Sequence, residues 1–199
     1  RLSELGCRAR IEEERAHGGY WFPLGVPSAL AGAAGLWALR GGRRARAAAV
    51  GAGAFAAAAI WDDVGGGALW FRRRFLPRRP TWNVVAEAGD PEAPRTLVLV
   101  AHHDAAHWGI LFHPGVLPLV DRIAPGLLER ASTSPPLMAP VFAGPALVAL
   151  GALTGSRRLL ALGTGLALAS AATFAEIGSR DAVPGANDNL TGVATLIGV

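Results

Sequence analysis

Long apolar stretches separated by short arginine-containing turns dominate the hydrophobic pattern of the chain. The first pair of apolar stretches covers residues 21–39 and 47–61, and the second pair covers residues 136–153 and 159–177. A membrane-spanning helix needs about 20 predominantly apolar residues. The pattern therefore predicts about four transmembrane helices in two hairpins. Since small residues permit close helix packing in either solvent, buried alanine- and glycine-rich helices of a soluble protein are the alternative.

Segments with a strand pattern lie between the two apolar pairs. Residues 82–88 and 96–101 are predicted to form a β-hairpin around a turn at 89–94. The run Thr96–Val100 is apolar apart from its first residue, which is typical of a buried strand. Four further segments are predicted: a helix at 191–197, a broken interfacial helix within 114–130, a linker at 132–136, and a polar, helix-compatible segment at 1–20.

These elements predict an α/β portion that is interrupted by membrane helices. The expected divisions are an N-terminal segment with the first hairpin at 1–79, a first α/β part at 80–135, an inserted hairpin at 136–178, and a second α/β part at 179–199. Because the chain begins at Arg1 and stops at Val199 inside a predicted helix, we expect it to be a fragment of a longer protein.

The composition agrees with membrane helices. Hydrophobic residues make up 51% of the chain, which is high for a soluble domain. All 19 basic residues are arginines, and they gather at the ends of apolar stretches, as membrane flanks do. We therefore expect a lipid bilayer and no nucleic acid as a partner, although the net charge is +4. The arginine distribution weakly favours a cytoplasmic location for the side that carries residues 72–79. The sequence does not decide on which face of the membrane the candidate site lies.

Two short polar motifs carry the candidate chemistry. His102 and Asp104 alternate along an extended segment, so their side chains are predicted to point to the same side. Imidazole is a common zinc ligand, and a neighbouring carboxylate can accept the proton of its other ring nitrogen and thereby orient it. Asp188, in the glycine-containing segment 184–189, could supply a second ligand or bridge two metals. The single cysteine, Cys7, excludes an intrachain disulfide and a cysteine-based zinc cluster.

Residues 83–104, which end in Ala101-His102-His103-Asp104, resemble the opening block of the M28 family of zinc peptidases, and residues 184–196 resemble its next block. The resemblance implies an aminopeptidase-like fold and two zinc ions. It implies that His102 is a zinc ligand, that Asp104 supports it, and that Asp188 bridges the metals, often with a cis peptide bond after it. A pair of glutamates, another acidic ligand and a final histidine would lie beyond Val199.

The implied function is metal-dependent peptide hydrolysis by an integral membrane protein. With two of the zinc ligands, this chain is expected to be inactive by itself. The alternatives are a non-catalytic membrane scaffold or binding protein with a peptidase-like domain, and a zinc hydrolase of non-peptide amides. The sequence leaves substrate specificity and oligomeric state open.

Other polar and aromatic residues near these segments are predicted to have structural roles. His103 is expected to point away from His102, and Asp62 and Asp63 are expected to form a solvated helix terminus. Structural or surface roles are also predicted for His107, His113, Glu176 and Asp181, and membrane-interface roles for Trp21, Trp61, Trp70 and Trp82.

Overall fold

The computed structural model describes residues 1–126 and 138–198. The chain forms two compact units. Unit 1 contains residues 1–18, 77–108 and 181–199, and unit 2 contains residues 19–76 and 109–180. Residues 1–18 thus group with 77–108 and not with the first apolar pair. The predicted linker at 132–136, and the last residues of the predicted interfacial helix, lie outside the described residues.

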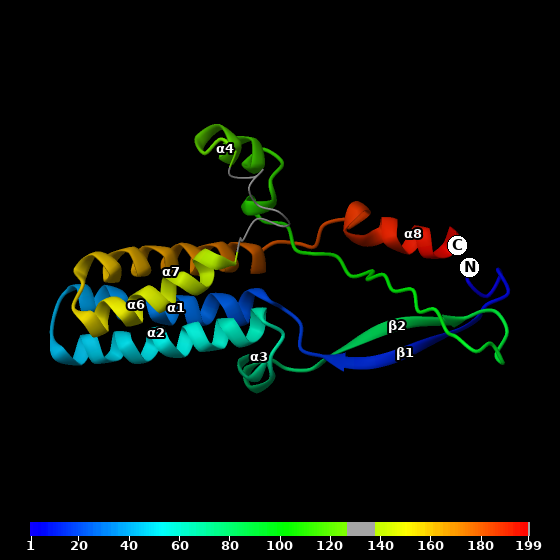
Figure 1. Cartoon of the computed structure of the whole chain (residues 1–199), viewed down its shortest axis with the longest axis horizontal. Helices are drawn as coiled ribbons and strands as arrows, with labels where there is room; N and C mark the ends of the chain where they lie inside the picture. The colour runs from blue at the N-terminus through cyan, green and yellow to red at the C-terminus, as the bar shows by residue number, and fades with distance from the viewer. Residues whose placement is uncertain (127–137, 199) are drawn as a thin grey trace. The chain divides into compact units, whose positions relative to one another are not determined.

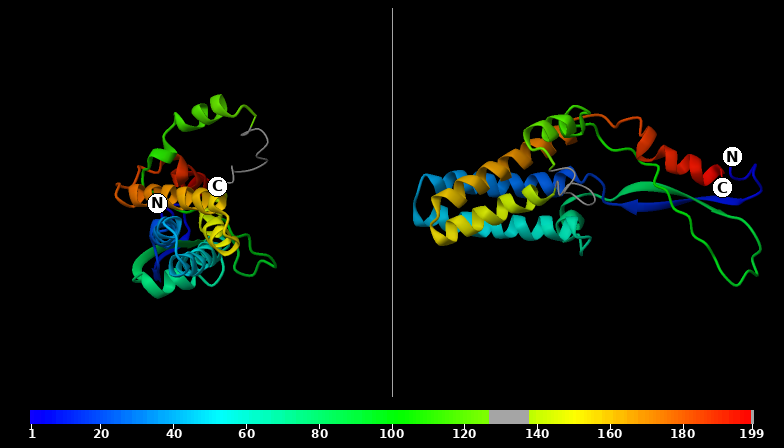
Figure 2. Two further views of the ribbon diagram at one scale, coloured as in Figure 1. Left: turned by 90° about the vertical axis from the view of Figure 1, so that its left-hand side faces the viewer. Right: turned by 45° about the horizontal axis from the view of Figure 1, so that its top comes forward.

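Unit 2 is built around four long helices that lie side by side (Figures 1 and 2). They are α1 (Trp21–Leu39), α2 (Arg43–Val64), α6 (Ala139–Thr154) and α7 (Arg157–Gly178). Helix α1 packs against α2 and α7, and α6 packs against the same two helices. The shorter elements η1 (Ile110–Phe112), α4 (Val116–Ile123) and α3 (Trp70–Phe75) complete the unit. The two predicted helical hairpins are therefore present as one bundle.

Three of the four long helices, α1, α2 and α7, are long and apolar enough to span a membrane. Helix α6 has 16 residues, a length of about 24 Å at 1.5 Å per residue, which is short of a typical hydrocarbon core. Three of the four predicted membrane helices therefore have the length of a full span, and the fourth, α6, is shorter.

Small residues allow the helix backbones of the bundle to approach closely. Ala31, Ala49 and Ala56 are fully buried. At Gly163 of α7, an added Cβ would lie 2.5 Å from the backbone nitrogen of Val148 and 2.8 Å from the carbonyl oxygen of Gly144, both in α6. Helices α6 and α7 can therefore pack in this way only because residue 163 has no side chain.

Two arginines connect the helical hairpins at the turns. Arg46 of α2 donates hydrogen bonds of 3.1 and 3.2 Å to the carbonyl oxygen of Ala152 in α6. Arg157 of α7 donates one of 3.0 Å to the carbonyl oxygen of Leu39 in α1. The last carbonyl groups of a helix have no partner within the helix, and these guanidinium groups supply one. Each hairpin thus contributes a cation to a helix end of the other.

The structure corrects the expected end of the second apolar helix. Helix α2 continues beyond residue 61 and includes Asp62 and Asp63, which are not a freely solvated terminus. The carboxylate of Asp62 accepts hydrogen bonds from the backbone N–H groups of Ala68 and Trp70 at 2.8 and 2.9 Å. The side chain of Asp63 is 5% exposed and pairs with Arg72 at 2.6 Å. Both charges are satisfied locally, which removes the cost of extending the helix through them.

Unit 1 contains a two-stranded antiparallel ribbon (Figure 1). Strand β1 (Arg8–Ala16) pairs with β2 (Arg79–Glu87) in a register that runs from Arg8 opposite Glu87 to Ala16 opposite Arg79. The predicted strand at 82–88 is therefore present with a different partner, and the helix-compatible N-terminal segment is a strand. Cross-strand ion pairs contribute to this register, since both Arg8 and Arg10 contact Glu87.

The expected strand at 96–101 is not formed, and the predicted β-hairpin is wrong. These residues are extended and make no ladder with any other part of the chain that the structure describes. Residues 97–100 are exposed, from 50% for Leu99 to 85% for Val100, where the sequence predicts burial. The described residues accordingly form a mostly helical chain with one small sheet, and the expected α/β zinc-peptidase sheet is not among them. The predicted helix after residue 190 is confirmed as α8 (Thr191–Gly198).

The close contact at Gly163 predicts a specific sensitivity of the bundle. Gly163→Ala is expected to lower the free energy of unfolding by about 1–3 kcal/mol, because its methyl group meets backbone atoms of α6. Gly165→Ala, two residues along in open space, is the control and should be neutral or stabilising by up to about 1 kcal/mol. Thermal unfolding in detergent, followed by circular dichroism, measures both. Equal stability of the two variants would contradict the packing described.

The ribbon predicts a pH dependence at Glu87. Arg10 lowers the pKa of the Glu87 carboxyl below its ordinary value, mainly through a hydrogen bond of 2.8 Å. Because the pKa is lower in the folded ribbon, the pair stabilises the ribbon above the pKa of the unfolded carboxyl, and this contribution is lost as the pH falls through the folded pKa. Arg10→Gln should raise the pKa of Glu87 in a carboxyl NMR titration, whereas Arg15→Gln, opposite Pro80, should leave it unchanged.

Candidate functional site

A short antiparallel bridge brings the two polar motifs together in unit 1. His107 lies opposite Ala182. The backbone N–H of Trp108 donates to the carbonyl oxygen of Asp181 at 3.0 Å, and that of Val183 donates to the carbonyl oxygen of Ala106 at 2.9 Å. The first motif lies just before this bridge and the second lies just after it, so two segments that are distant in sequence become neighbours.

The three predicted site residues meet at this place. The imidazole of His102 lies between two carboxylates: its Nε2 is 3.1 Å from Oδ1 of Asp188, and its Nδ1 is 3.5 Å from Oδ1 of Asp104. All three side chains are open to solvent, with exposed fractions of 53% for His102, 90% for Asp104 and 75% for Asp188. The arrangement gives each ring nitrogen its own carboxylate and leaves the cluster accessible to a ligand.

The turn that carries Asp188 is built around a glycine. Gly185 has a positive φ of 69°, a conformation that glycine adopts without steric cost, and its carbonyl accepts a hydrogen bond from the N–H of Leu190 at 3.0 Å. This closes the η2 turn (Ala186–Leu190). The peptide bond between Asp188 and Asn189 is cis, as the resemblance implies. Asn189 then accepts a hydrogen bond from the N–H of Gly192 at 3.2 Å, in the first turn of α8.

His103, His113 and Glu176 have partners outside the cluster. Nε2 of His103 lies 3.2 Å from the carbonyl oxygen of Trp82, so this side chain attaches the motif to strand β2. In unit 2, Nδ1 of His113 accepts a hydrogen bond from the N–H of Gly115 at 3.0 Å. Glu176, also in unit 2, accepts one from the N–H of Ile110 at 3.1 Å and pairs with Arg180 at 2.8 Å. These contacts are structural.

The donor set fits part of a zinc site. Two ligands of one tetrahedral zinc, each about 2.0–2.1 Å from it, lie about 3.3 Å apart. The separation of 3.1 Å between His102 Nε2 and Asp188 Oδ1 is close to this value and equally matches a direct hydrogen bond. Within residues 1–126 and 138–198, no group of three or more His, Cys, Asp or Glu side chains is placed to hold a metal ion. The cluster thus supplies two donors of the three or four that zinc needs.

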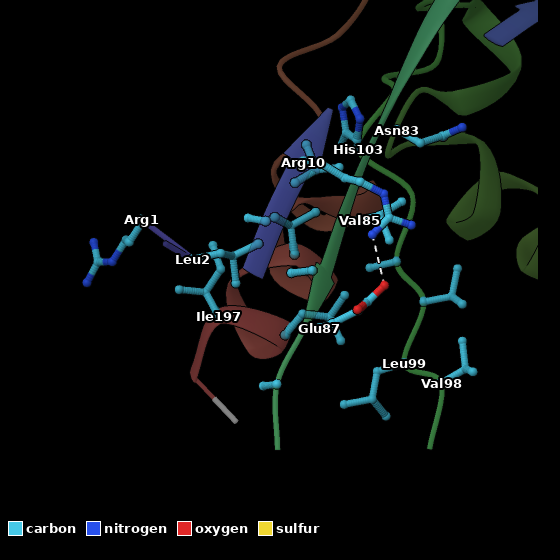
Figure 3. A pocket seen from close by; sticks show the side chains of 18 of the residues that line it. Arg1, Leu2, Arg10, Asn83, Val85, Glu87, Val98, Leu99, His103 and Ile197 are labelled. Carbon is cyan, nitrogen blue, oxygen red and sulfur yellow. Dashed lines mark hydrogen bonds and ion pairs between the residues drawn. The ribbon is translucent and has the colours of Figure 1, made fainter. Parts of the chain in front are cut away.

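An apolar groove of about 1030 Å³ lies in unit 1 (Figure 3). Its walls come from the β1–β2 ribbon, the extended segment 96–101 and helix α8, and His103 lines it. The ion pair between Arg10 and Glu87 lies on the ribbon wall, while Leu99 and Val98 lie on the wall formed by the extended segment. The apolar side chains that were expected to be buried in a sheet therefore line this groove.

Sequence reasoning missed the elements that hold the site together. The pairing of β1 with β2 has one weak sequence signal, the alternation of Arg8, Ala9, Arg10 and Ile11 at its start. The bridge at His107 and Ala182 involves too few residues for any periodicity to reveal it.

In this arrangement Asp104 can orient the imidazole of His102 through Nδ1. Nε2 of His102 and the carboxylate of Asp188 can then be offered to a metal. No family model, no curated protein and no solved structure matches the chain. The chemistry of the cluster is therefore argued from its own residues.

Proposed function

We propose that the chain is part of an integral membrane zinc hydrolase of the M28-like peptidase type. The observation that carries the proposal is the convergence of His102, Asp104 and Asp188 from two distant segments onto one exposed point. These residues are the ones to which the motif resemblance assigns the roles of ligand, supporting carboxylate and bridging ligand. Peptides, or other amides, are the proposed substrates.

Each residue of the cluster has a distinct role in this proposal. Nε2 of His102 and the carboxylate of Asp188 would hold the metal, and Asp104 would accept a hydrogen bond from the Nδ1–H group, which fixes the tautomer that leaves Nε2 free to bind. When bound, zinc supplies Lewis acidity toward a substrate carbonyl and a water of lowered pKa. Asp188, whose side chain is 75% exposed, would be the residue shared with a further metal.

The zinc proposal predicts a loss of metal affinity in two variants. The wild-type chain in detergent should bind zinc weakly, since two protein donors are fewer than zinc requires, and His102→Ala and Asp188→Ala should each lower this affinity at least about tenfold. Asp181→Asn is the control because the backbone of Asp181, and not its side chain, contributes to the bridge. Isothermal titration calorimetry measures the affinities.

Equal zinc affinity in the wild type, His102→Ala and Asp188→Ala would contradict the assignment. The alternative of a non-catalytic scaffold expects the same two donors within the described ranges. Hydrolysis of an aminoacyl anilide by the longest natural chain that carries these motifs, lost in Asp188→Ala, distinguishes the enzyme from the scaffold.

We infer that the membrane topology follows from the two antiparallel pairings of unit 1. Residues 19–76 leave and re-enter this unit beside the pair of Ala16 and Arg79, and residues 109–180 do so beside the bonded pair of Trp108 and Asp181. A segment whose two ends are hydrogen-bonded neighbours must cross a membrane an even number of times. If α7 spans the membrane, residues 109–180 must contain a second crossing, and among the described residues of this segment α6 is the helix that supplies it; a short helix is accommodated by local thinning of the bilayer.

This topology predicts which cysteines react from the same side. The test uses a membrane-impermeant maleimide on sealed vesicles. It should label the native Cys7 of unit 1 from one side. It should label Arg158→Cys, made in a Cys7→Ser background at the turn between α6 and α7, from the opposite side. Val183→Cys in the same background should react from the side of Cys7. Labelling of residues 158 and 183 from one side would overturn the even-crossing assignment.

A further inference from the structure

The short helix α3 is held firmly against the bundle of unit 2. Arg72 donates two hydrogen bonds, of 3.0 and 2.6 Å, to the carboxylate of Asp63 in α2. Phe71 is 5% exposed, and its ring centroid lies 6.3 Å from that of Phe22 in α1 and 5.9 Å from that of Phe55 in α2. These contacts fix the orientation of α3 and therefore determine which of its side chains face outward.

The outward face combines aromatic and cationic side chains. Trp70, Arg73 and Arg74 occupy positions i, i+3 and i+4 of the helix, so they lie on one face, and all three are exposed. Phe75 is 54% exposed, and the guanidinium carbon of Arg74 lies 5.6 Å from its ring centroid. Trp70 is 38% exposed, and its ring also packs edge-on against Phe55 of α2, with the centroids 5.4 Å apart. Phe75 follows Arg74 in the sequence, so two partly exposed rings lie beside the two guanidinium groups.

The positive charge of this face is not compensated. The charge of Arg72 is matched by Asp63, whereas Arg73 and Arg74 have no carboxylate within ion-pair distance in the part of the chain that the structure describes. Guanidinium groups bind phosphate oxygens through paired hydrogen bonds. Tryptophan is enriched where hydrocarbon meets the headgroup region. Aromatic rings next to cations therefore match the interface of a bilayer, where apolar acyl chains adjoin anionic headgroups.

We propose that the outward face of α3 binds the headgroup of an anionic phospholipid. Arg73 and Arg74 contact the phosphate, and Trp70 and Phe75 enter the adjoining acyl region, which fixes the depth of the bundle in the bilayer. This inference rests on the membrane location proposed above and not on the zinc chemistry. The ion pair between Arg72 and Asp63 holds α3 in the orientation that this lipid interaction needs.

Titration of the detergent-solubilised chain with phosphatidylglycerol tests the proposal. We expect a saturable change in tryptophan emission that is lost in Trp70→Phe, and an apparent affinity lowered about tenfold or more in Arg73→Gln/Arg74→Gln. Arg43→Gln/Arg44→Gln, the matched pair of exposed arginines at the start of α2, should keep the affinity within about twofold because no aromatic residue lies beside them in the sequence.

The other outcomes each decide a question. An equal response to phosphatidylcholine, or an unchanged affinity in Arg73→Gln/Arg74→Gln with normal circular dichroism, would overturn the proposal. Full competition by inorganic phosphate would replace it with a site for the free anion. Failure of the chain to resist alkaline extraction from vesicles of phosphatidylcholine and phosphatidylglycerol would refute the membrane location, whereas extraction-resistant chain without headgroup preference would refute only the role of α3.

Discussion

Two backbone hydrogen bonds, between residues 106–108 and 181–183, are the constraint on which the candidate site depends. The chain between these segments contains η1, α4, α6 and α7, and it returns to the place from which it left. Within unit 1, the bridge holds the segments that carry His102 and Asp188 close together. The bridge therefore converts two distant motifs into one cluster, and the glycine turn at residue 185 then directs Asp188 toward the imidazole.

The helical unit is stabilised in a way that suits a low-dielectric surrounding. Two of its buried hydroxyl groups are satisfied within their own helices, as Ser28 donates to the carbonyl oxygen of Leu24 and Thr164 to that of Leu160, both at 2.7 Å. Its charged groups lie at helix ends, where Arg46 and Arg157 bind carbonyl oxygens of neighbouring helices. Close contact of backbones at glycine and alanine then supplies the packing that does not depend on water.

The sequence predicted the parts of this structure that local pattern determines. The helices were accessible because long apolar runs with small residues have few alternatives, although the extension of α2 through Asp62 and Asp63 depended on partners in a later turn. The three site residues were identified from their donor types and from the alternation of His102 and Asp104, and the motif resemblance then gave each of them a role. Strand pairing was not accessible, because the partner of β2 is a segment near the N-terminus and not the apolar segment that follows β2. An apolar run such as 97–100 indicates that burial of its side chains is favourable, but it does not identify the segment against which they pack.

The pairing of Ala16 with Arg79 and the bonded pair of Trp108 and Asp181 place both ends of each helical segment at neighbouring residues of unit 1. Because each segment starts and ends at neighbours, a longer or shorter helix within it shifts no residue of either pairing. The segments that carry His102 and Asp188 therefore stay joined at the bridge. The geometry of the cluster is in this respect independent of the length of the helices that separate its residues in sequence.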